Sequence, residues 1–473
     1  MSPSPSRRLA ATFAAVLTTA AVLGATAVAV QAESLQAVVQ RALETNPELG
    51  AIKFNRHAID KELDGARGLY LPTVDVRLDG GRERNNARSA IGTSTNNNWH
   101  NSRDASVFVS QRLFDGFESV HEVARQKNRV ESSRWRVTDT ANSIALRTVQ
   151  AYLEVQRAAA VLGSARGNLS QLQSINERVL ARVRGGKSNA AEESEAGARV
   201  AGARAIAAEA EARLRDAEAL YRSVVGGPPG KLEAVHVPRN ALPKAVEIAV
   251  AEAREAAPSV LATQFDTVAA GAAVGSAYSR LYPRLNFELS SDHRADSTAT
   301  GDRNNDTRAL VVLRWNLFNG GIDRARIEEA RFRASEASEI SANTQRTIER
   351  ETRVSWNALA AAASRVPAFK RQLELNRATR AAYIQQYDAG QRRLLDLLEV
   401  QSEIFVTESS LRTEELVGQF SAFRVLAAMG RLVPALGLGF PDEATTSHAT
   451  RFYDRWLTSV HRPAVIHVST GTK

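Results

Sequence analysis

The chain of 473 residues contains no cysteine. Without thiols it can form no disulfide, thiolate zinc site or iron–sulfur cluster, and it has no cysteine nucleophile and no cysteine for lipid attachment. Aromatic residues are scarce, at 6% of the chain, and there are only 14 prolines. Alanine is abundant and the charges are mostly Arg and Glu. This composition favours long helices over a sandwich of β-sheets.

Long hydrophobic runs are also scarce. Mean hydropathy is −0.27, which argues against a protein built of many membrane-spanning helices. One uncharged, largely apolar run, residues 9–30, follows two arginines and precedes Ala32. This arrangement predicts a secretory signal peptide over residues 1–32, cut after Ala32. A retained N-terminal anchor is the alternative.

The chain is basic, with a formal net charge of +9. Removing residues 1–32, which hold two arginines and no acid, leaves +7. Basic proteins can bind nucleic acid, but the charges here are interspersed and no five basic residues are consecutive. Together with the export signal, this argues against a nucleic-acid partner.

Motifs of enzymes are present only in fragments. The segment 185–188 is similar to the end of a phosphate-binding loop, but Ala181 stands where the first glycine is required. His121-Glu122 begins a zinc-protease pattern, but Arg125 stands where the second histidine belongs. No serine or aspartate lies in a nucleophile elbow. The sequence therefore predicts no enzyme, no cofactor and no metal site.

The chain repeats itself. The motif Leu113-Phe114-Asp115-Gly116 returns as Leu317-Phe318-Asn319-Gly320, an offset of 204 that also relates Gly186 to Gly390. Earlier in the copies, Tyr70-Leu71-Pro72 and Leu281-Tyr282-Pro283 are 211 residues apart. The second copy has therefore lost seven residues between Pro283 and Leu317, and the sequence predicts two tandem copies of one unit.

Each copy has room for long helices. Residues 35–69 have helical composition, and the roughly 70 residues from Gly116 to Gly186 contain no proline. Within this stretch an apolar residue recurs at every seventh position, as in a left-handed coiled coil: Val123, Val130, Val137, Ile144, Ala151, Ala158, Ala165, Leu172 and Val179. Residues 190–225 are again helical. Because a 70-residue helix is about 105 Å long, each copy predicts one long helix paired with two stacked half-helices.

Between its helices, each copy predicts one β-hairpin. Apolar residues alternate with polar ones in both first strands, at Val74, Val76 and Leu78 and at Leu285, Phe287 and Leu289. Such strands are typical of membrane β-barrels, and also of half-buried hairpins in other proteins. In lipid, four strands could not close a barrel, and their edges would need partners from other subunits. We therefore infer an oligomer.

These features resemble the TolC family of trimeric outer-membrane channel-tunnels. The resemblance rests on the paired Leu-Phe-Asp-Gly and Leu-Phe-Asn-Gly motifs, on the Tyr-Leu-Pro and Leu-Tyr-Pro entries to the strands, and on the turn at residues 387–390 with the segment 394–399. It covers about residues 33–432. It implies a mainly α fold with a transmembrane β-barrel, in which duplicated half-repeats form a long coiled-coil α-helical barrel. Four β-strands per chain would close a 12-stranded barrel in a homotrimer.

The repeat and the resemblance together predict four parts of the chain. Each repeat is expected to run half-helix, β-hairpin, long helix, half-helix, with the hairpins at about 70–115 and 282–318. The parts are the signal peptide 1–32, the first repeat 33–230, the second repeat 231–432 and a C-terminal periplasmic tail 433–473.

The resemblance implies an exit duct in the outer membrane of a Gram-negative bacterium, in contact with lipid and extending into the periplasm. The duct would passively conduct substrate delivered by an inner-membrane ABC or proton-driven transporter and a periplasmic adaptor (membrane fusion) protein. The similarity of residues 118–157 and the lack of a lipidated cysteine favour type I protein secretion. Small-molecule or multidrug efflux is the alternative, and a periplasmic coiled-coil scaffold without a pore is a third.

The resemblance also implies an entrance at the two helix turns, Gly186 and Gly390. Asp396 and Glu399, three residues apart on one helix, match the family's acidic ring, which would hold six carboxylates in a trimer. Because like charges repel, we expect raised pKa values and bound cations there.

A gate lock is implied beside the ring. Arg392 matches a family residue that ties the inner hairpin to its neighbour, and Glu192 and Tyr387 match its partners. We expect Arg392 to pair with Glu192, with a hydrogen bond from Tyr387. Ala191 replaces a small hydroxyl residue of the family, so one contact is missing. The alternative for the lock residues is that they are ordinary solvated charges on helix surfaces. We expect solvent or the adaptor to face three other basic residues at the turn, Arg182, Arg184 and Lys187.

Overall fold

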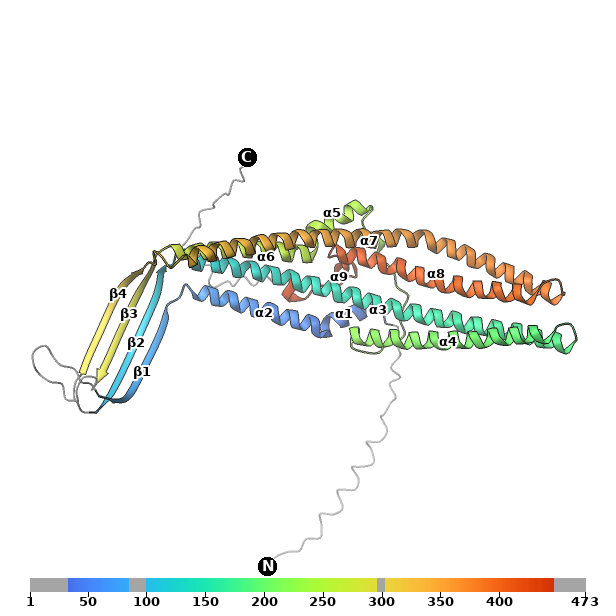
Figure 1. Cartoon of the computed structure of the whole chain (residues 1–473), viewed down its shortest axis with the longest axis horizontal. Helices are drawn as coiled ribbons and strands as arrows, with labels where there is room; N and C mark the ends of the chain where they lie inside the picture. Colours follow the sequence, from blue (N-terminus) through green and yellow to red (C-terminus); the bar gives the residue numbers. More distant parts are fainter. Residues whose placement is uncertain (1–32, 85–98, 296–302, 446–473) are drawn as a thin grey trace, which may run out of the picture.

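The computed structural model describes residues 33–84, 99–295 and 303–445. These residues form an elongated molecule, with a small antiparallel sheet at one end and the turns between the longest helices at the other (Figure 1). Helices run side by side over most of the length between the two ends. The shape agrees with the mainly helical fold that the sequence predicts.

The first half-helix is two helices, α1 (Leu35–Thr45) and α2 (Pro47–Gly68), where composition alone predicts one. Asn46 separates them, because its extended backbone ends α1 while its side chain accepts a hydrogen bond from the Glu48 amide at 2.9 Å. Pro47 then begins α2 at a position where a missing N–H needs no partner. The second copy has the same break, between α5 (Val246–Ala256) and α6 (Pro258–Tyr278).

The long helix of the first copy is α3 (Glu118–Arg184), with 67 residues and a length of about 100 Å. All nine positions of its seven-residue apolar pattern are buried, which confirms the predicted seam. The helix α4 (Ala190–Val225) returns along it. In the second copy, α7 (Ile322–Asp388) also has 67 residues and is followed by α8 (Leu394–Ala428).

The helices lie in a fixed order across the molecule. α3 contacts α2, α4, α6 and α8, whereas α7 contacts α5, α6 and α8. α6 thus lies between the two long helices (Figure 1). Single 3-10 turns, η1 (Arg239–Ala241) and η2 (Ser279–Leu281), precede α5 and the second hairpin.

The sheet has the order β1-β2-β3-β4, and every pairing is antiparallel. Its strands are β1 (Thr73–Glu83), β2 (His100–Phe114), β3 (Arg284–Ala295) and β4 (Arg303–Arg314). The two hairpins have the same register, because Val74 pairs with Val109 just as Leu285 pairs with Leu313. The offset is 211 along β1 and β3 and 204 along β2 and β4, so the seven missing residues fall at the hairpin tip.

The largest apolar core lies midway along the molecule, where α1, α3, α4, α8 and the short helix α9 (Leu432–Ala435) meet. Beside it Glu33 receives hydrogen bonds from Arg41 (2.9 Å) and from the Tyr221 hydroxyl (3.2 Å). Burial acts to raise the pKa of Glu33, but these bonds and the Arg41 charge outweigh it and lower the pKa. The Tyr152 hydroxyl binds the Glu33 carbonyl at 2.7 Å. Glu33 therefore stays ionised and ties the start of the described chain to α3 and α4.

Part of the C-terminal tail packs on the same region. α9 and α10 (Asp442–Thr445) both contact α3. The Glu443 carboxylate lies 3.4 Å from Lys53 Nζ and 3.6 Å from His57 Nε2, both on α2. The remainder of the predicted tail, residues 446–473, and the predicted signal peptide, residues 1–32, lie outside the described residues.

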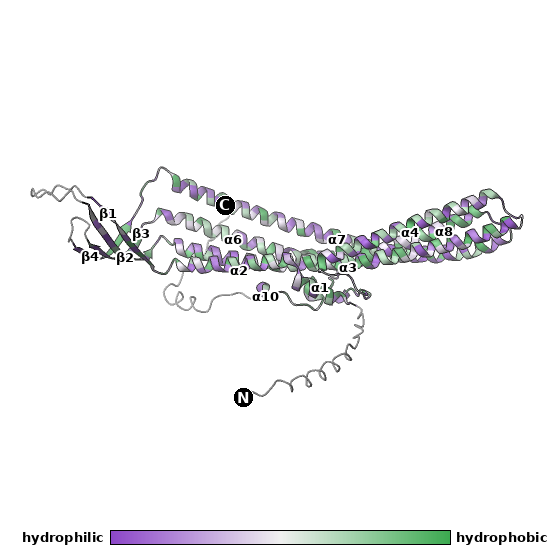
Figure 2. Ribbon diagram, turned by 90° about the horizontal axis from the view of Figure 1, so that it is seen from below, coloured by the Kyte–Doolittle hydropathy of each residue, from purple (hydrophilic) through white to green (hydrophobic). Residues whose placement is uncertain are grey.

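Hydrophilic and hydrophobic residues alternate along the helices (Figure 2). Within the described ranges, no helix combines the length and the apolar character needed to cross a membrane.

Candidate functional site at the helix turns

The turns α3–α4 and α7–α8 lie at the same end of the molecule, opposite the sheet (Figure 1). They are built alike: the Lys187 amide donates to the Arg182 carbonyl, and the Gln391 amide to the Gln386 carbonyl, both at 2.8 Å. In each turn the amide donates to the carbonyl five residues earlier in the chain. This hydrogen bond ends the helix and requires a positive φ at the residue just before the donor. Gly186 (φ 70°) and Gly390 (φ 79°) occupy those positions, which glycine adopts at little steric cost.

Arg182 connects the two turns. Its Nη1 donates to the carbonyls of Tyr387 (2.9 Å) and Asp388 (3.1 Å), and its Nη2 to the Lys187 carbonyl (3.4 Å). The guanidinium also lies over the Tyr387 ring, 4.7 Å from its centroid. A cation is favourable here because the last carbonyls of α7 carry the negative end of that helix dipole. The expectation that Arg182 faces solvent or an adaptor is therefore wrong for this chain.

Arg178, one turn earlier on α3, adds an ion pair with Asp388 at 2.9 Å. Sequence reasoning missed both arginines as connectors. Basic residues in the last turn of a helix are a known signal. Such residues are expected to bind the last carbonyls of their own helix. Here Arg182 of α3 binds the last carbonyls of α7 instead.

Tyr387 is held from both sides. It is 2% exposed, its ring lies under Arg182, and its hydroxyl donates to Glu192 Oε2 at 3.4 Å. Burial, and next the Glu192 charge, raise the pKa of Tyr387, so the hydroxyl keeps its proton and remains a donor. Ser188 also donates to Glu192, whose own amide is capped by the Asn189 side chain at 3.0 Å. The chain thus brings together Tyr387 and Glu192 of the expected lock.

Arg392 does not reach Glu192 within the described chain. Its Nε donates to Gln386 Oε1 at 3.0 Å, and its guanidinium lies over the Tyr383 ring at 4.1 Å. Its Nη1 lies 3.5 Å from Asp396 Oδ2. Within a single chain Arg392 thus braces its own hairpin, and its pairing with Glu192 in the assembled entrance stays a prediction.

The two acidic residues differ in their surroundings. Asp396 is paired with Arg393 (2.9 Å) and Arg392 (3.5 Å). Desolvation acts to raise the pKa of Asp396, but the hydrogen bonds and charges of Arg393 and then Arg392 outweigh it, and the pKa is lowered. The neighbouring arginines thus set the pKa of Asp396 within one chain, and the rise expected for a trimeric ring of carboxylates stays a prediction. Glu399, one turn further, is exposed.

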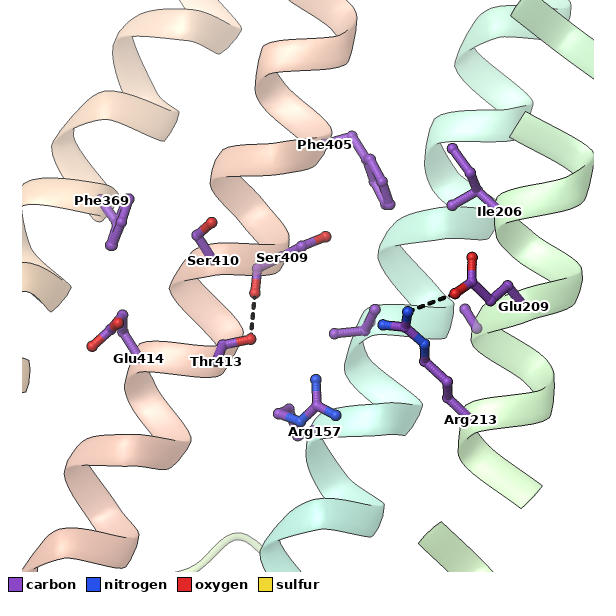
Figure 3. Close-up of a pocket in the computed structure, with 12 residues that line it drawn as sticks. Arg157, Ile206, Glu209, Arg213, Phe369, Phe405, Ser409, Ser410, Thr413 and Glu414 are labelled. Carbon is purple, nitrogen blue, oxygen red and sulfur yellow. Dashed lines mark hydrogen bonds and ion pairs between the residues drawn. The ribbon is translucent and has the colours of Figure 1, made fainter. Parts of the chain in front are cut away.

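A groove lies further from the turns, between the α3/α4 and α7/α8 pairs (Figure 3). Phe369, Phe405 and Ile206 line it, together with charged residues such as Arg157 and Glu414. Arg213 and Glu209 bind each other at 2.5 Å across one turn of α4. No nucleophile with an adjacent base lines this groove. Among the described residues, no group of His, Asp and Glu side chains is arranged to hold a metal ion.

Comparisons with known proteins agree with this architecture. The family model described as "Outer membrane efflux protein" matches residues 38–227 and 249–422, the greater part of both copies. The outer membrane efflux protein BepC of Brucella suis is 25% identical over 447 residues, which cover 94% of this chain and 95% of the relative. The outer membrane protein TolC of Vibrio cholerae is 24% identical, over 87% of this chain and 94% of the relative.

Solved structures show the same fold. A membrane protein of Pseudomonas aeruginosa has a TM-score of 0.74 at 19% identity, covering 84% of this chain and 90% of that one. The outer membrane protein VceC of Vibrio cholerae has a TM-score of 0.72 at 17% identity, covering 86% and 97%. The chain therefore belongs to the outer membrane efflux protein family, and it is an outer-membrane channel protein and not an enzyme.

Proposed function

We propose that three copies of this chain form a passive exit duct through the outer membrane and across the periplasm. The observation that carries the proposal is the division of the chain into a sheet at one end and two linked helix turns at the other (Figure 1). In the described chain the outer edges of β1 and β4 pair with no other strand. Since lipid offers no hydrogen bonds to such edges, strands from other copies must close them.

The duct would complete a tripartite exporter. An inner-membrane ABC or proton-driven transporter would supply the energy, and a periplasmic adaptor would dock at the helix turns. The absence of any catalytic arrangement in the described site supports a passive role. At the entrance, Arg182, Tyr387 and Glu192 would hold the α7–α8 turn against the α3–α4 turn in the closed state.

We propose protein as the substrate, by type I secretion. The resemblance of residues 118–157 to the secretion branch supports this, as does the absence of cysteine for a lipid anchor. Small-molecule efflux is the second candidate, favoured by the name of the relative BepC, an efflux protein.

The test compares cells with and without this gene. Secreted and surface proteins are quantified by mass spectrometry, and susceptibility to dyes and antibiotics is measured in the same strains. Restoring the gene on a plasmid is the control. Loss of one or a few large proteins, with unchanged susceptibility, would support secretion and identify the cargo.

An unchanged protein profile with increased susceptibility would contradict secretion and support efflux. The duct itself is tested separately, by single-channel currents of the purified protein in planar bilayers. A protein that does not conduct ions and does not sediment with outer membranes would contradict both versions.

A further inference from the structure

The two faces of the sheet differ in composition. Residues that pair across antiparallel strands point to the same side of a sheet, so the register assigns each strand residue to one of two faces. One face, here called the apolar face, carries most of the apolar side chains of the strands. Six exposed examples are Val74, Val76, Leu78, Leu289, Val311 and Leu313. Such a face turns to lipid when strands form a membrane barrel.

The opposite side, here called the polar face, carries every acid of the four described strands. These acids are Asp75, Asp79, Glu83, Asp104, Glu288, Asp292 and Asp306. The ion pairs described within the sheet also lie there, for example Arg77 with Asp79 at 2.6 Å. From Asn286 to His293 on β3, side chains alternate between partly buried on the polar face and exposed on the apolar face. The polar face is therefore the concave side, which would line the inside of a barrel.

The apolar face carries four basic residues and no acid. Each strand contributes one of them: Arg82, Arg103, His293 and Arg303. All four lie within three residues of the strand end that is further from the helices (Figure 1). The part of the apolar face nearer the helices has no charged residue. We call these four residues the basic rim.

The residues of the basic rim are close enough to act together. Arg103 and Arg303 pair with Ala295 from its two sides, so their backbones are about 10 Å apart. Arg82 is the diagonal neighbour of Arg103, and His293 is the diagonal neighbour of both Arg103 and Arg303. Diagonal neighbours are about 7–8 Å apart, within reach of long side chains. Since no acid shares their face, their positive charges add and require an anion from outside the sheet.

The length of β4 gives the depth of the rim in a membrane. Trp315, at the helix end of β4, is exposed and is of the type found at membrane interfaces. The twelve residues from Arg303 to Trp315 span about 40 Å of strand, or about 30 Å along the membrane normal at a typical tilt. The apolar band of a barrel is about 25 Å tall. The rim therefore lies just beyond that band, at the level of lipid headgroups.

We infer that the basic rim binds the phosphate groups of lipid headgroups in the outer leaflet of the membrane. The inference rests on the proposed duct and adds a lipid partner, on the side away from the periplasm. A guanidinium binds phosphate oxygens with two parallel hydrogen bonds, and an imidazole N–H adds another. The absence of acid from this face means that no divalent cation is needed between protein and phosphate.

The test measures lipid binding by the purified full chain in detergent. The probe is diphosphoryl lipid A, and native mass spectrometry counts the bound lipids. R82Q/R103Q/R303Q removes the arginine charges of the rim. The matched control R77Q/R294Q/R308Q removes the same charge from the polar face of the same sheet. R82K/R103K/R303K keeps the charge of the rim, and circular dichroism shows which variants are folded.

The affinity of R82Q/R103Q/R303Q for diphosphoryl lipid A should fall at least about tenfold, because each basic residue beside anionic lipid contributes on the order of fivefold. The control and the lysine variant should stay within about threefold of the wild type. Lipid A without phosphates should bind the wild type as weakly as the intact lipid binds R82Q/R103Q/R303Q. Binding of the intact lipid should survive EDTA, since no cation bridges the contact.

Three outcomes would overturn the inference. The first is equal binding by the wild type and R82Q/R103Q/R303Q, and the second is an equal loss in R77Q/R294Q/R308Q, which would report net charge alone. The third is inorganic phosphate that binds as tightly as the lipid. Single-channel currents of the same preparations separate this inference from the proposed duct. A conducting protein with any of these outcomes would overturn the rim alone, and a protein that neither conducts nor binds lipid would overturn the duct as well.

Discussion

At the scale of single residues, the site depends on a few charged side chains that reach backbone carbonyls. Arg182 is the main example, because three carbonyls and one aromatic ring surround its guanidinium. A hydrogen bond from a charged donor that is shielded from water contributes about 1.5–3 kcal/mol to stability. These contacts join α3 to the end of α7, so they oppose any outward movement of the α7–α8 turn.

We predict that Arg182→Gln loosens the entrance. The shorter, neutral side chain cannot span the three carbonyls, so open states in planar bilayers should be larger or longer-lived than in the wild type. Arg184→Gln is the matched control, since Arg184 is exposed and the charge change is the same. Indistinguishable currents from the two variants would contradict a role for Arg182 in closure.

At the scale of elements, the junction between β2 and α3 is packed more tightly than the turn between α3 and α4. Gly116 (φ 68°) and Gly186 (φ 70°) have nearly the same backbone conformation. A Cβ on Gly116 would lie 2.5 Å from the Ser279 carbonyl oxygen and 2.8 Å from the Tyr282 Cβ, whereas a Cβ on Gly186 would meet nothing within 4 Å. Gly116 thus lies against backbone and side-chain atoms of the second copy, whereas Gly186 has open space around it.

We therefore predict that Gly116→Ala is more harmful than Gly186→Ala. Both should lose about 1–2 kcal/mol from the left-handed backbone alone, but Gly116→Ala must also move backbone of the second copy. The measurement is the temperature at which helical circular dichroism is lost in detergent. Equal shifts for the two variants would mean that the contact at Ser279 relaxes freely.

At the scale of the whole molecule, the proposed acidic ring exists only when three chains meet. Within one chain Asp396 is already paired with two arginines, while Glu399 is exposed. In the proposed pore, the carboxylate of Glu399 would therefore be the one free to bind a cation. Asp396 and Glu399, which the sequence analysis assigns to the same acidic ring, would therefore have different roles.

We predict that Glu399→Gln weakens the block of the channel by divalent cations more than Asp396→Asn does. The measurement is the concentration of Mg²⁺ that halves the single-channel current, with the double variant as reference. A larger effect of Asp396→Asn would show that the arginines leave Asp396 when the trimer forms.

The architecture of the chain could be predicted from its sequence. The repeat, the seven-residue apolar pattern of α3 and the alternation in the strands are periodic, and periodicity follows directly from helix and strand geometry. The glycines of the two turns could be found for a similar reason, because only a positive φ closes a helix in that way.

Which charged side chains contact each other, in contrast, depends on the three-dimensional packing of the helices. The family resemblance implies that Arg392 pairs with Glu192, and Arg182 is expected to face solvent or the adaptor. Within one chain Arg392 contacts its own hairpin and Arg182 the end of α7. A long side chain can reach several partners within one turn of its helix, and its choice depends on how neighbouring helices are rotated. That rotation is set by the packing of the whole bundle, which no local pattern in the sequence records.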